Sequence, residues 1–266
     1  GGIGAGLMYW CGIEWTYYYT APPFGAAPRS TEAAEWASTY GMYHWGITAW
    51  AIYCLPALAI AYPYYTRRIP WLRFSNGCHR YLQGRELGPT SRFVDFWLMV
   101  AIIAGAGSSL AFCTPMIAAC IARVFGVPYE FWMNLLVIGL SVAIFATSVW
   151  LGLKRGMKNL SDLTLLLSFV FLAYMLIVGP TNFLVRASVN SVGVMLQNYI
   201  RMNFWTDPYL RSGFLENWTI FYWAWWMSYA PFIGLFVTRI SRGQTIREVI
   251  VGMLVFQSAD PQPVMD

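Results

Sequence analysis

The chain has 266 residues, of which 58% are hydrophobic, 18% are aromatic and only 11% are charged. Soluble domains carry about 25% charged residues, so this composition excludes an ordinary soluble enzyme and intrinsic disorder and indicates a membrane protein. The net charge of +5 does not indicate nucleic-acid binding, because the Arg residues lie in gaps between apolar runs, where they suit a membrane surface.

Six apolar stretches approach the length of a membrane span, which takes about 20 residues. In chain order they are Ile3–Tyr19, Met42–Tyr64, Phe93–Val124, Phe131–Leu153, Leu163–Phe183 and Trp218–Ile240. One such run also suits a buried core helix, but six in one chain favour a membrane bundle. We therefore expect an all-α integral membrane protein with about six transmembrane helices.

The positive charges alternate between the gaps. The gaps after the second, fourth and sixth stretches hold 12 of the 17 basic residues, which predicts that the first helix begins and the sixth ends on the cytoplasmic side. The segment Arg186–Phe204 is different, because its apolar residues recur at helical spacing with polar residues between them. It predicts an amphipathic helix that lies along the outer interface.

Few side chains suit catalysis or metal binding. The five Cys form no CxxC pair, and the two His, His44 and His79, are far apart, so we expect no metal site, no disulfide and no resident cofactor. Glu14 lies inside the first stretch, where an ionisable residue is a functional candidate, but a wetted structural role near the helix end fits equally. Glycines at positions 2, 4 and 6 allow either a cation to approach the backbone or close helix packing.

Aromatic residues gather in the second and sixth stretches. At 100° per residue, Trp45 and Trp50 are offset by about 140° and Tyr53 lies about 60° from Trp50, so the three can line an open wall. In the sixth stretch, Trp225 or Trp226 pairs with Tyr229 on one face. Aromatic faces attract cations that cannot be satisfied by hydrogen bonds, such as a quaternary ammonium. The pattern therefore predicts a cage for a methylated cation.

Two other functions are compatible with a bundle of apolar helices. A membrane enzyme needs grouped His or carboxylate residues within the spans, and the sequence offers only Glu14 and His44 there. A structural or channel-like bundle would use its Trp residues as lipid anchors at the headgroups. The depth and direction of the Trp side chains separate that possibility from a cage.

The sequence resembles a known transporter family. Residues 217–226 read NWTIFYWAWW and resemble the signature of the betaine/carnitine/choline transporter family, as do Arg239–Gly243 and His44–Gly46 with Trp50 and Tyr53. The resemblance covers residues 1–256, and the tail 257–266 does not match. It implies an inverted-repeat (LeuT-like) bundle of twelve helices, built on two five-helix repeats.

The resemblance also implies how the chain is organised. Residues 1–256 would form a partial transporter domain that holds the third to eighth helices of a longer protein. This region would comprise the first five-helix repeat, an interfacial helix near 186–204 and the first helix of the second repeat at 218–240.

The residues that the resemblance implies for substrate binding are aromatic and come from three helices: Trp45, Trp50, Tyr53, Trp225, Trp226, Tyr229 and Tyr17. Trp45, Trp50 and Tyr53 match box residues on one helix, and Trp226 matches the box residue on another, with Trp225 and Tyr229 beside it. Tyr17 matches an aromatic residue that contacts substrate in carnitine exchangers.

Sodium coupling is implied by some positions and opposed by others. The Ile3 position resembles one that gives a backbone carbonyl to Na⁺, and Ser109 and Phe232 resemble positions of a second sodium site. Near Ser109, however, the chain has Ala106 and Ile102 where a sodium-coupled relative has Thr.

Sodium-independent exchangers are matched no better. They carry an Arg and a Met at positions that align with Thr164 and Ile233. Glu14-Trp15 and Thr114-Pro115 nevertheless resemble the exchangers, whereas Gly2–Gly6 and Pro231-Phe232 resemble the symporters. The sequence thus leaves the coupling ion open.

Taken as a whole, the resemblance implies a secondary active transporter of glycine betaine, carnitine or choline. It would work by alternating access, without catalysis, as a homotrimer in the lipid bilayer of the cell inner (plasma) membrane, with Na⁺ as the candidate coupling ion and osmoprotection as a candidate role. No nucleic-acid partner is implied. A transporter of a dimethylsulfonium zwitterion and a sodium-independent carnitine/γ-butyrobetaine exchanger are the alternatives.

Overall fold

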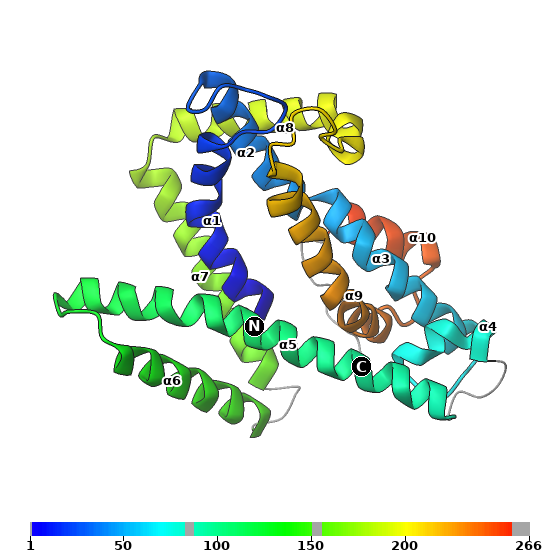
Figure 1. Cartoon of the computed structure of the whole chain (residues 1–266). Helices are drawn as coiled ribbons and strands as arrows, with labels where there is room; N and C mark the ends of the chain where they lie inside the picture. The colour runs from blue at the N-terminus through cyan, green and yellow to red at the C-terminus, as the bar shows by residue number, and fades with distance from the viewer. Residues whose placement is uncertain (1, 83–87, 151–155, 257–266) are drawn as a thin grey trace. The chain divides into compact units, whose positions relative to one another are not determined.

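The computed structural model describes residues 2–82, 88–150 and 156–256. The side chains of residues 2–8, 11, 79, 80, 149, 156–161 and 256 are not among those described. Within these ranges all regular elements are helical, which confirms the predicted all-α class (Figure 1). The tail 257–266 lies outside the described residues.

Most of the described residues lie in the longer helices. They are α1 (Gly2–Thr20), α2 (Thr31–Trp45), α3 (Ile47–Ala61), α5 (Pro89–Phe125), α6 (Phe131–Trp150), α7 (Gly156–Val178), α8 (Thr181–Phe204) and α9 (Phe221–Ile240). The shorter ones are η1 (Tyr62–Thr66), η2 (Phe74–Cys78), α4 (His79–Leu82), η3 (Leu215–Ile220), α10 (Ile246–Val251) and η4 (Gly252–Phe256). Of these, η1, η3 and η4 are π-helical turns and η2 is a 3₁₀ turn.

The predicted spans recur with changed bounds. Among the described residues, four helical runs are long and apolar enough to cross a membrane: Thr31–Thr66, Pro89–Phe125, Phe131–Ser148 and Leu215–Ile240. A fifth is possible if Asp162–Val178 and Thr181–Phe204, which meet at 114°, form one broken span. The first predicted span, Ile3–Tyr19, is helical in α1, and its role as a span remains a prediction.

The chain divides into two compact units. The first comprises residues 1–14 and 108–197, and the second comprises residues 15–107 and 198–266. In the first unit, α5 and α6 form a hairpin around small and apolar side chains, namely Ala118, Ala122, Met133 and Val137. Gly126, with φ +66°, lets the chain turn at the end of α5, because this left-handed conformation costs glycine little.

From Leu165 to Val178, helix α7 of the first unit is apolar on all sides except at Ser168. Leu166, Phe169, Ile177 and Val178 are all more than half exposed on the described chain. Such a helix is stable only when lipid or other protein surrounds it. It ends at Gly179-Pro180, and α8 begins at Thr181 after a sharp bend. Helix α8 includes the predicted amphipathic segment Arg186–Phe204, whose place at an interface remains a prediction.

The second unit is built on the close crossing of α3 and α9, which run side by side (Figure 1). A Cβ added at Gly234 would lie 3.0 Å from the backbone nitrogen of Ala57, so only glycine permits this approach. Four residues later, the Thr238 hydroxyl lies 2.8 Å from the Gly234 carbonyl of its own helix and 3.2 Å from the Ala57 carbonyl of α3, so its one proton is shared between the two helices. Small residues and a hydroxyl bond are the usual means of joining two helices in a membrane. This crossing fixes the register of the aromatic residues on both helices.

Candidate functional site

A break between α2 and α3 begins the candidate site. Gly46 has φ −93° and ψ −146°, and a Cβ there would lie only 2.6 Å from the Met42 carbonyl oxygen. Carbonyls in the last turn of a helix need partners from elsewhere. The Trp226 indole nitrogen of α9 donates a hydrogen bond to the His44 carbonyl at 3.0 Å. The break is therefore joined directly to an aromatic side chain of the predicted box.

Four of the predicted residues form a continuous chain of ring contacts, which we call the ring chain: Trp45, Trp226, Tyr53 and Trp50. The ring centroids of Trp45 and Trp226 are 4.8 Å apart, those of Trp226 and Tyr53 are 6.1 Å apart, and those of Tyr53 and Trp50 are 5.5 Å apart. All three pairs meet edge to face, the arrangement that aromatic quadrupoles favour. The structure thus brings together residues from α2, α3 and α9.

Two further rings of α9 stack against the ring chain. The Trp225 ring lies nearly parallel to Trp226, with an interplanar angle of 13° and centroids 5.1 Å apart. Tyr222 stacks on Trp226 at 5.8 Å and also contacts Trp45. Tyr222 was not among the residues predicted from the sequence, although its position four residues before Trp226 placed it on the same helix face.

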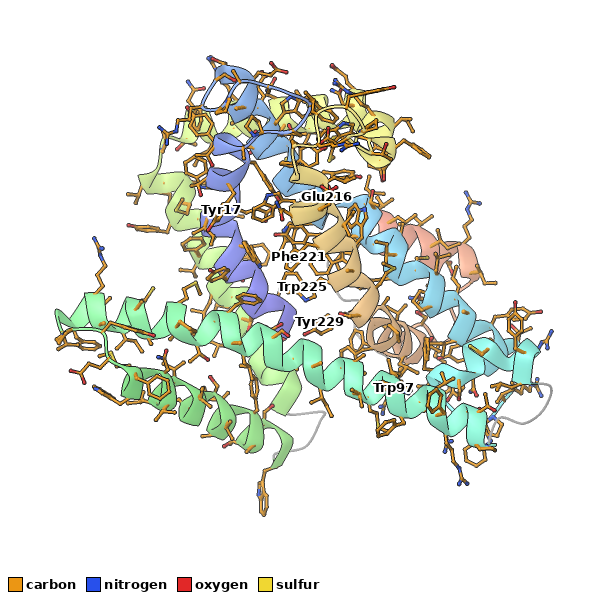
Figure 2. All side chains as sticks on the ribbon, in the orientation of Figure 1. Tyr17, Trp97, Glu216, Phe221, Trp225 and Tyr229 are labelled. Atoms are coloured by element: carbon orange, nitrogen blue, oxygen red, sulfur yellow. The ribbon has the colours of Figure 1, made fainter. Side chains whose placement is uncertain are left out.

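The other two predicted residues are Tyr229, whose phenol interacts electrostatically with that of Tyr53 in the ring chain, and Tyr17. Tyr229 is buried, and a Cβ added at Gly105 of α5 would lie 3.0 Å from its ring. Tyr17 is 49% exposed, and its ring contacts Trp218 at 5.3 Å. Figure 2 marks Phe221, Trp225 and Tyr229 along α9, with Tyr17 on α1. Tyr17 therefore extends the aromatic surface at the end of α1.

The residues predicted to bind sodium are distributed over both units. Ile3 is helical in α1, with its side chain outside the description, and Ser109 is buried in the first unit. Phe232 belongs to the second unit and is 45% exposed. Each unit is described by itself, so a sodium site composed of these residues remains a prediction. Glu14, the ionisable candidate of the first stretch, is buried with 4% exposure.

A buried cluster around His44 adjoins the ring chain. The Tyr18 hydroxyl and His44 Nδ1 are 2.9 Å apart, and His44 Nε2 and the Thr219 hydroxyl are 3.1 Å apart. The imidazole also stacks on Tyr222, with centroids 4.7 Å apart. This His44 cluster ties α1, α2 and the turn η3 together through side-chain hydrogen bonds. It thereby holds the end of α2 from which the Trp45 ring projects.

A second aromatic group, the Arg201 cluster, contains Phe24, Trp36, Trp205 and Arg201. The Arg201 guanidinium carbon lies 4.0 Å from the Phe24 ring centre and 6.0 Å from that of Trp36, within the range of cation–π attraction. Phe24 has φ +59°, which is unusual for a bulky residue. This conformation places its ring 4.4 Å from Trp205 and 4.7 Å from Trp36.

The loop that carries Trp205 is fixed by a carboxylate. Asp207 accepts hydrogen bonds from the Ser212 backbone nitrogen and hydroxyl, both at 2.6 Å. These bonds favour the ionised carboxylate and lower the pKa of Asp207 below its ordinary value. The loop that supplies Trp205 to the Arg201 cluster is thus stabilised by the hydrogen bonds of the Asp207 carboxylate.

The ring chain presents aromatic surface to a ligand. Trp226 is buried at 2% exposure, whereas Trp45, Trp50 and Trp225 are half-buried. Trp45 and Trp226 contact each other, so no ligand fits between that pair, and a cation bound here would have to contact the outer faces of the rings. A cation within about 6 Å of several ring centres is attracted to each of them. The arrangement can therefore hold a cation by aromatic faces, without covalent chemistry.

Comparisons with known proteins identify relatives over nearly the whole chain. Residues 1–259 match the profile of the BCCT, betaine/carnitine/choline family transporter. The chain is 37% identical to the uncharacterized transporter YeaV of Escherichia coli over 254 residues, which cover 96% of this chain and 53% of that protein. It is 34% identical to a carnitine transporter of Acinetobacter baumannii over 254 residues, which cover 96% of this chain and 46% of that protein. The chain thus spans about half the length of the curated relatives that it matches.

Proposed function

Because the chain belongs to the betaine/carnitine/choline transporter family, we propose that the full-length protein transports a quaternary ammonium compound across a membrane, with carnitine as the first substrate to test. The observation that carries this proposal is the ring chain, which joins aromatic faces from α2, α3 and α9. The similarity to a named carnitine transporter supports the choice of carnitine. Family membership indicates a multi-pass membrane transporter and not an enzyme.

The aromatic surface suits the chemistry of this substrate class. A trimethylammonium group has no N–H to donate, so an acceptor cannot bind it through a hydrogen bond to nitrogen. Aromatic rings can still attract its positive charge through their quadrupoles. A desolvated face contributes about 2 kcal/mol, or roughly 30-fold in affinity. Glycine betaine, choline and dimethylsulfonium zwitterions carry comparable cationic groups. Glycine betaine and choline are the alternative substrates within this proposal, whereas transport of a dimethylsulfonium zwitterion would be a different function of the same site.

The first test removes the central ring. Trp226→Ala should lower carnitine affinity of the full-length protein at least about tenfold, because Trp226 contacts both Trp45 and Tyr53 and holds the break at His44. Trp226→Phe keeps an aromatic face but loses the indole donor, so its affinity should lie between those of Trp226→Ala and the wild type. Radiolabelled carnitine binding measures all three.

Trp150→Ala is the matched control, because Trp150 is 90% exposed on α6 and lies outside the ring chain. It should bind carnitine as the wild type does. If folded Trp226→Ala retains wild-type affinity, the ring chain is not the binding site. If the wild-type protein binds none of carnitine, glycine betaine and choline, the proposed function itself is wrong.

Coupling and assembly are further parts of this proposal. We take Na⁺ as the candidate coupling ion, with Ile3, Ser109 and Phe232 as its candidate positions, and a homotrimer in the inner (plasma) membrane as the candidate assembly. Carnitine uptake into proteoliposomes with and without a Na⁺ gradient distinguishes symport from sodium-independent exchange. Uptake that depends only on carnitine or γ-butyrobetaine inside the vesicles would favour exchange.

A further inference from the structure

The hydroxyl of Tyr53 is buried without a hydrogen-bond partner among the described residues. The side chain is 3% exposed, and no donor or acceptor of the described residues lies within hydrogen-bond distance of its oxygen. A buried hydroxyl that lacks a partner is costly, because it gives up its bonds to water on folding. A bound ligand with an acceptor group would remove that cost.

Tyr53 occupies an inner position of the ring chain. Its ring meets Trp226 on one side and Trp50 on the other, at interplanar angles of 69° and 66°. A cation held by these rings would therefore lie beside the Tyr53 phenol. An anionic group attached to the same molecule by a short linker would come within reach of the hydroxyl.

The stretches of α2, α3 and α9 that carry the ring chain contain no Lys or Arg that could pair with an anion. Residues 31–66 and 214–238 contain neither Lys nor Arg. A carboxylate removed from water must nevertheless be hydrogen-bonded. A neutral donor such as the Tyr53 hydroxyl meets that need without placing a permanent positive charge beside the cation, which it would repel.

Two other buried tyrosine hydroxyls lie outside the ring chain and so would not reach a ligand bound there. The hydroxyls of Tyr40 and Tyr43 also lack partners among the described residues. Their rings, however, contact the His44 cluster and neighbouring aromatic side chains, and neither belongs to the ring chain. Both are almost fully buried, with 0% and 1% exposure. They provide matched controls for a buried tyrosine hydroxyl outside the site.

From these observations, and resting on the proposed function, we infer that the Tyr53 hydroxyl donates a hydrogen bond to the anionic group of a zwitterionic substrate and so selects carnitine and glycine betaine over choline. Choline carries the same trimethylammonium group but no carboxylate. A hydrogen bond to a charged acceptor is stronger than one to a neutral group. A site with a buried donor discriminates against an analogue that lacks the acceptor.

Tyr53→Phe tests this role in the full-length protein, because it keeps the ring and removes only the hydroxyl. Its affinities for carnitine and glycine betaine should fall about tenfold or more, while its affinity for choline stays within about twofold of wild type. Tyr43→Phe should leave all three affinities unchanged. Competition against radiolabelled carnitine gives the affinities, and the melting temperature verifies that each variant is folded.

The inference is overturned if Tyr53→Phe keeps wild-type affinity for carnitine, or if choline loses as much affinity as carnitine. Either result leaves the proposed function intact, provided that Trp226→Ala still weakens carnitine binding. A wild-type protein that binds choline as tightly as glycine betaine also overturns the inference, because the hydroxyl then confers no selectivity. Failure of the wild type to bind any of the three ligands would instead reject the proposed function.

Discussion

The ring chain and the Arg201 cluster contain the same kinds of side chain in two different situations. In the Arg201 cluster, Phe24 and Trp36 face a guanidinium that the protein itself supplies. In the ring chain, no cation–π contact with a described Lys or Arg involves Trp50, Tyr53 or Trp226. Aromatic enrichment alone therefore does not identify a ligand site. The difference is whether the protein already provides the cation.

The comparison also separates two ways of holding aromatic rings in place. The ring chain is positioned by backbone features, namely the break at Gly46 and the Trp226 bond to the His44 carbonyl. The Arg201 cluster is positioned by the conformation of Phe24 and by the loop that Asp207 anchors. A substitution can therefore disturb the ring chain and leave the Arg201 cluster unchanged, or the reverse.

The larger effect is expected at Gly46. In Gly46→Ala the added Cβ must move away from the Met42 carbonyl, at a cost of about 1–3 kcal/mol, and the end of α2 that carries Trp45 must shift. Carnitine affinity should fall about tenfold, as measured by radioligand binding to the purified full-length protein.

Gly41→Ala is the control for that substitution. A Cβ at Gly41 of α2 has no neighbour within 4 Å, so this change should leave binding intact and favour the helix by up to about 1 kcal/mol. Equal binding by Gly46→Ala and the wild type would show that the break does not position the ring chain.

A smaller effect is expected at Arg201. Arg201→Ala removes an exposed cation–π contact worth about 0.5–1 kcal/mol, so the melting temperature should decrease slightly while carnitine affinity stays unchanged. Thermal unfolding and ligand binding measure the two effects separately. Arg186→Ala, at another exposed position of α8, should change neither. A loss of carnitine binding in Arg201→Ala comparable to that in Trp226→Ala would remove the distinction between the two clusters.

Much of the fold could be predicted because the apolar stretches are long. Hydropathy identified the regions of α5, α6 and α9, but it averages over a window and so missed the polar first turns of α2. The helix begins at Thr31, where Ser30 accepts a hydrogen bond from the Ala33 nitrogen and Glu32 lies in the first turn. Ser30 and Glu32 are a recognisable start signal. The break at Gly46 depends on Trp226, a partner 180 positions away in sequence, which periodicity cannot supply.

Part of the candidate site could be predicted because residue spacing within one helix can be read from the sequence. Helical spacing selected Trp45, Trp50 and Tyr53 in the second stretch and Trp225, Trp226 and Tyr229 in the sixth, and the resemblance added Tyr17. The angular argument gave an open wall for the first three, and the structure shows that Trp226 connects Trp45 to Tyr53. Spacing within one helix cannot determine which neighbouring helix a ring meets. Tyr222 was missed although its spacing from Trp226 within α9 placed both rings on one face, whereas the contact of Tyr17 with Trp218 depends on tertiary packing.

The most direct test is an experimental structure of the full-length protein with carnitine bound. The trimethylammonium group should lie within about 6 Å of the ring centres of Trp226 and at least one other ring-chain residue. A well-ordered carnitine whose ammonium group lies away from Trp45, Trp50, Tyr53 and Trp226 would contradict the account.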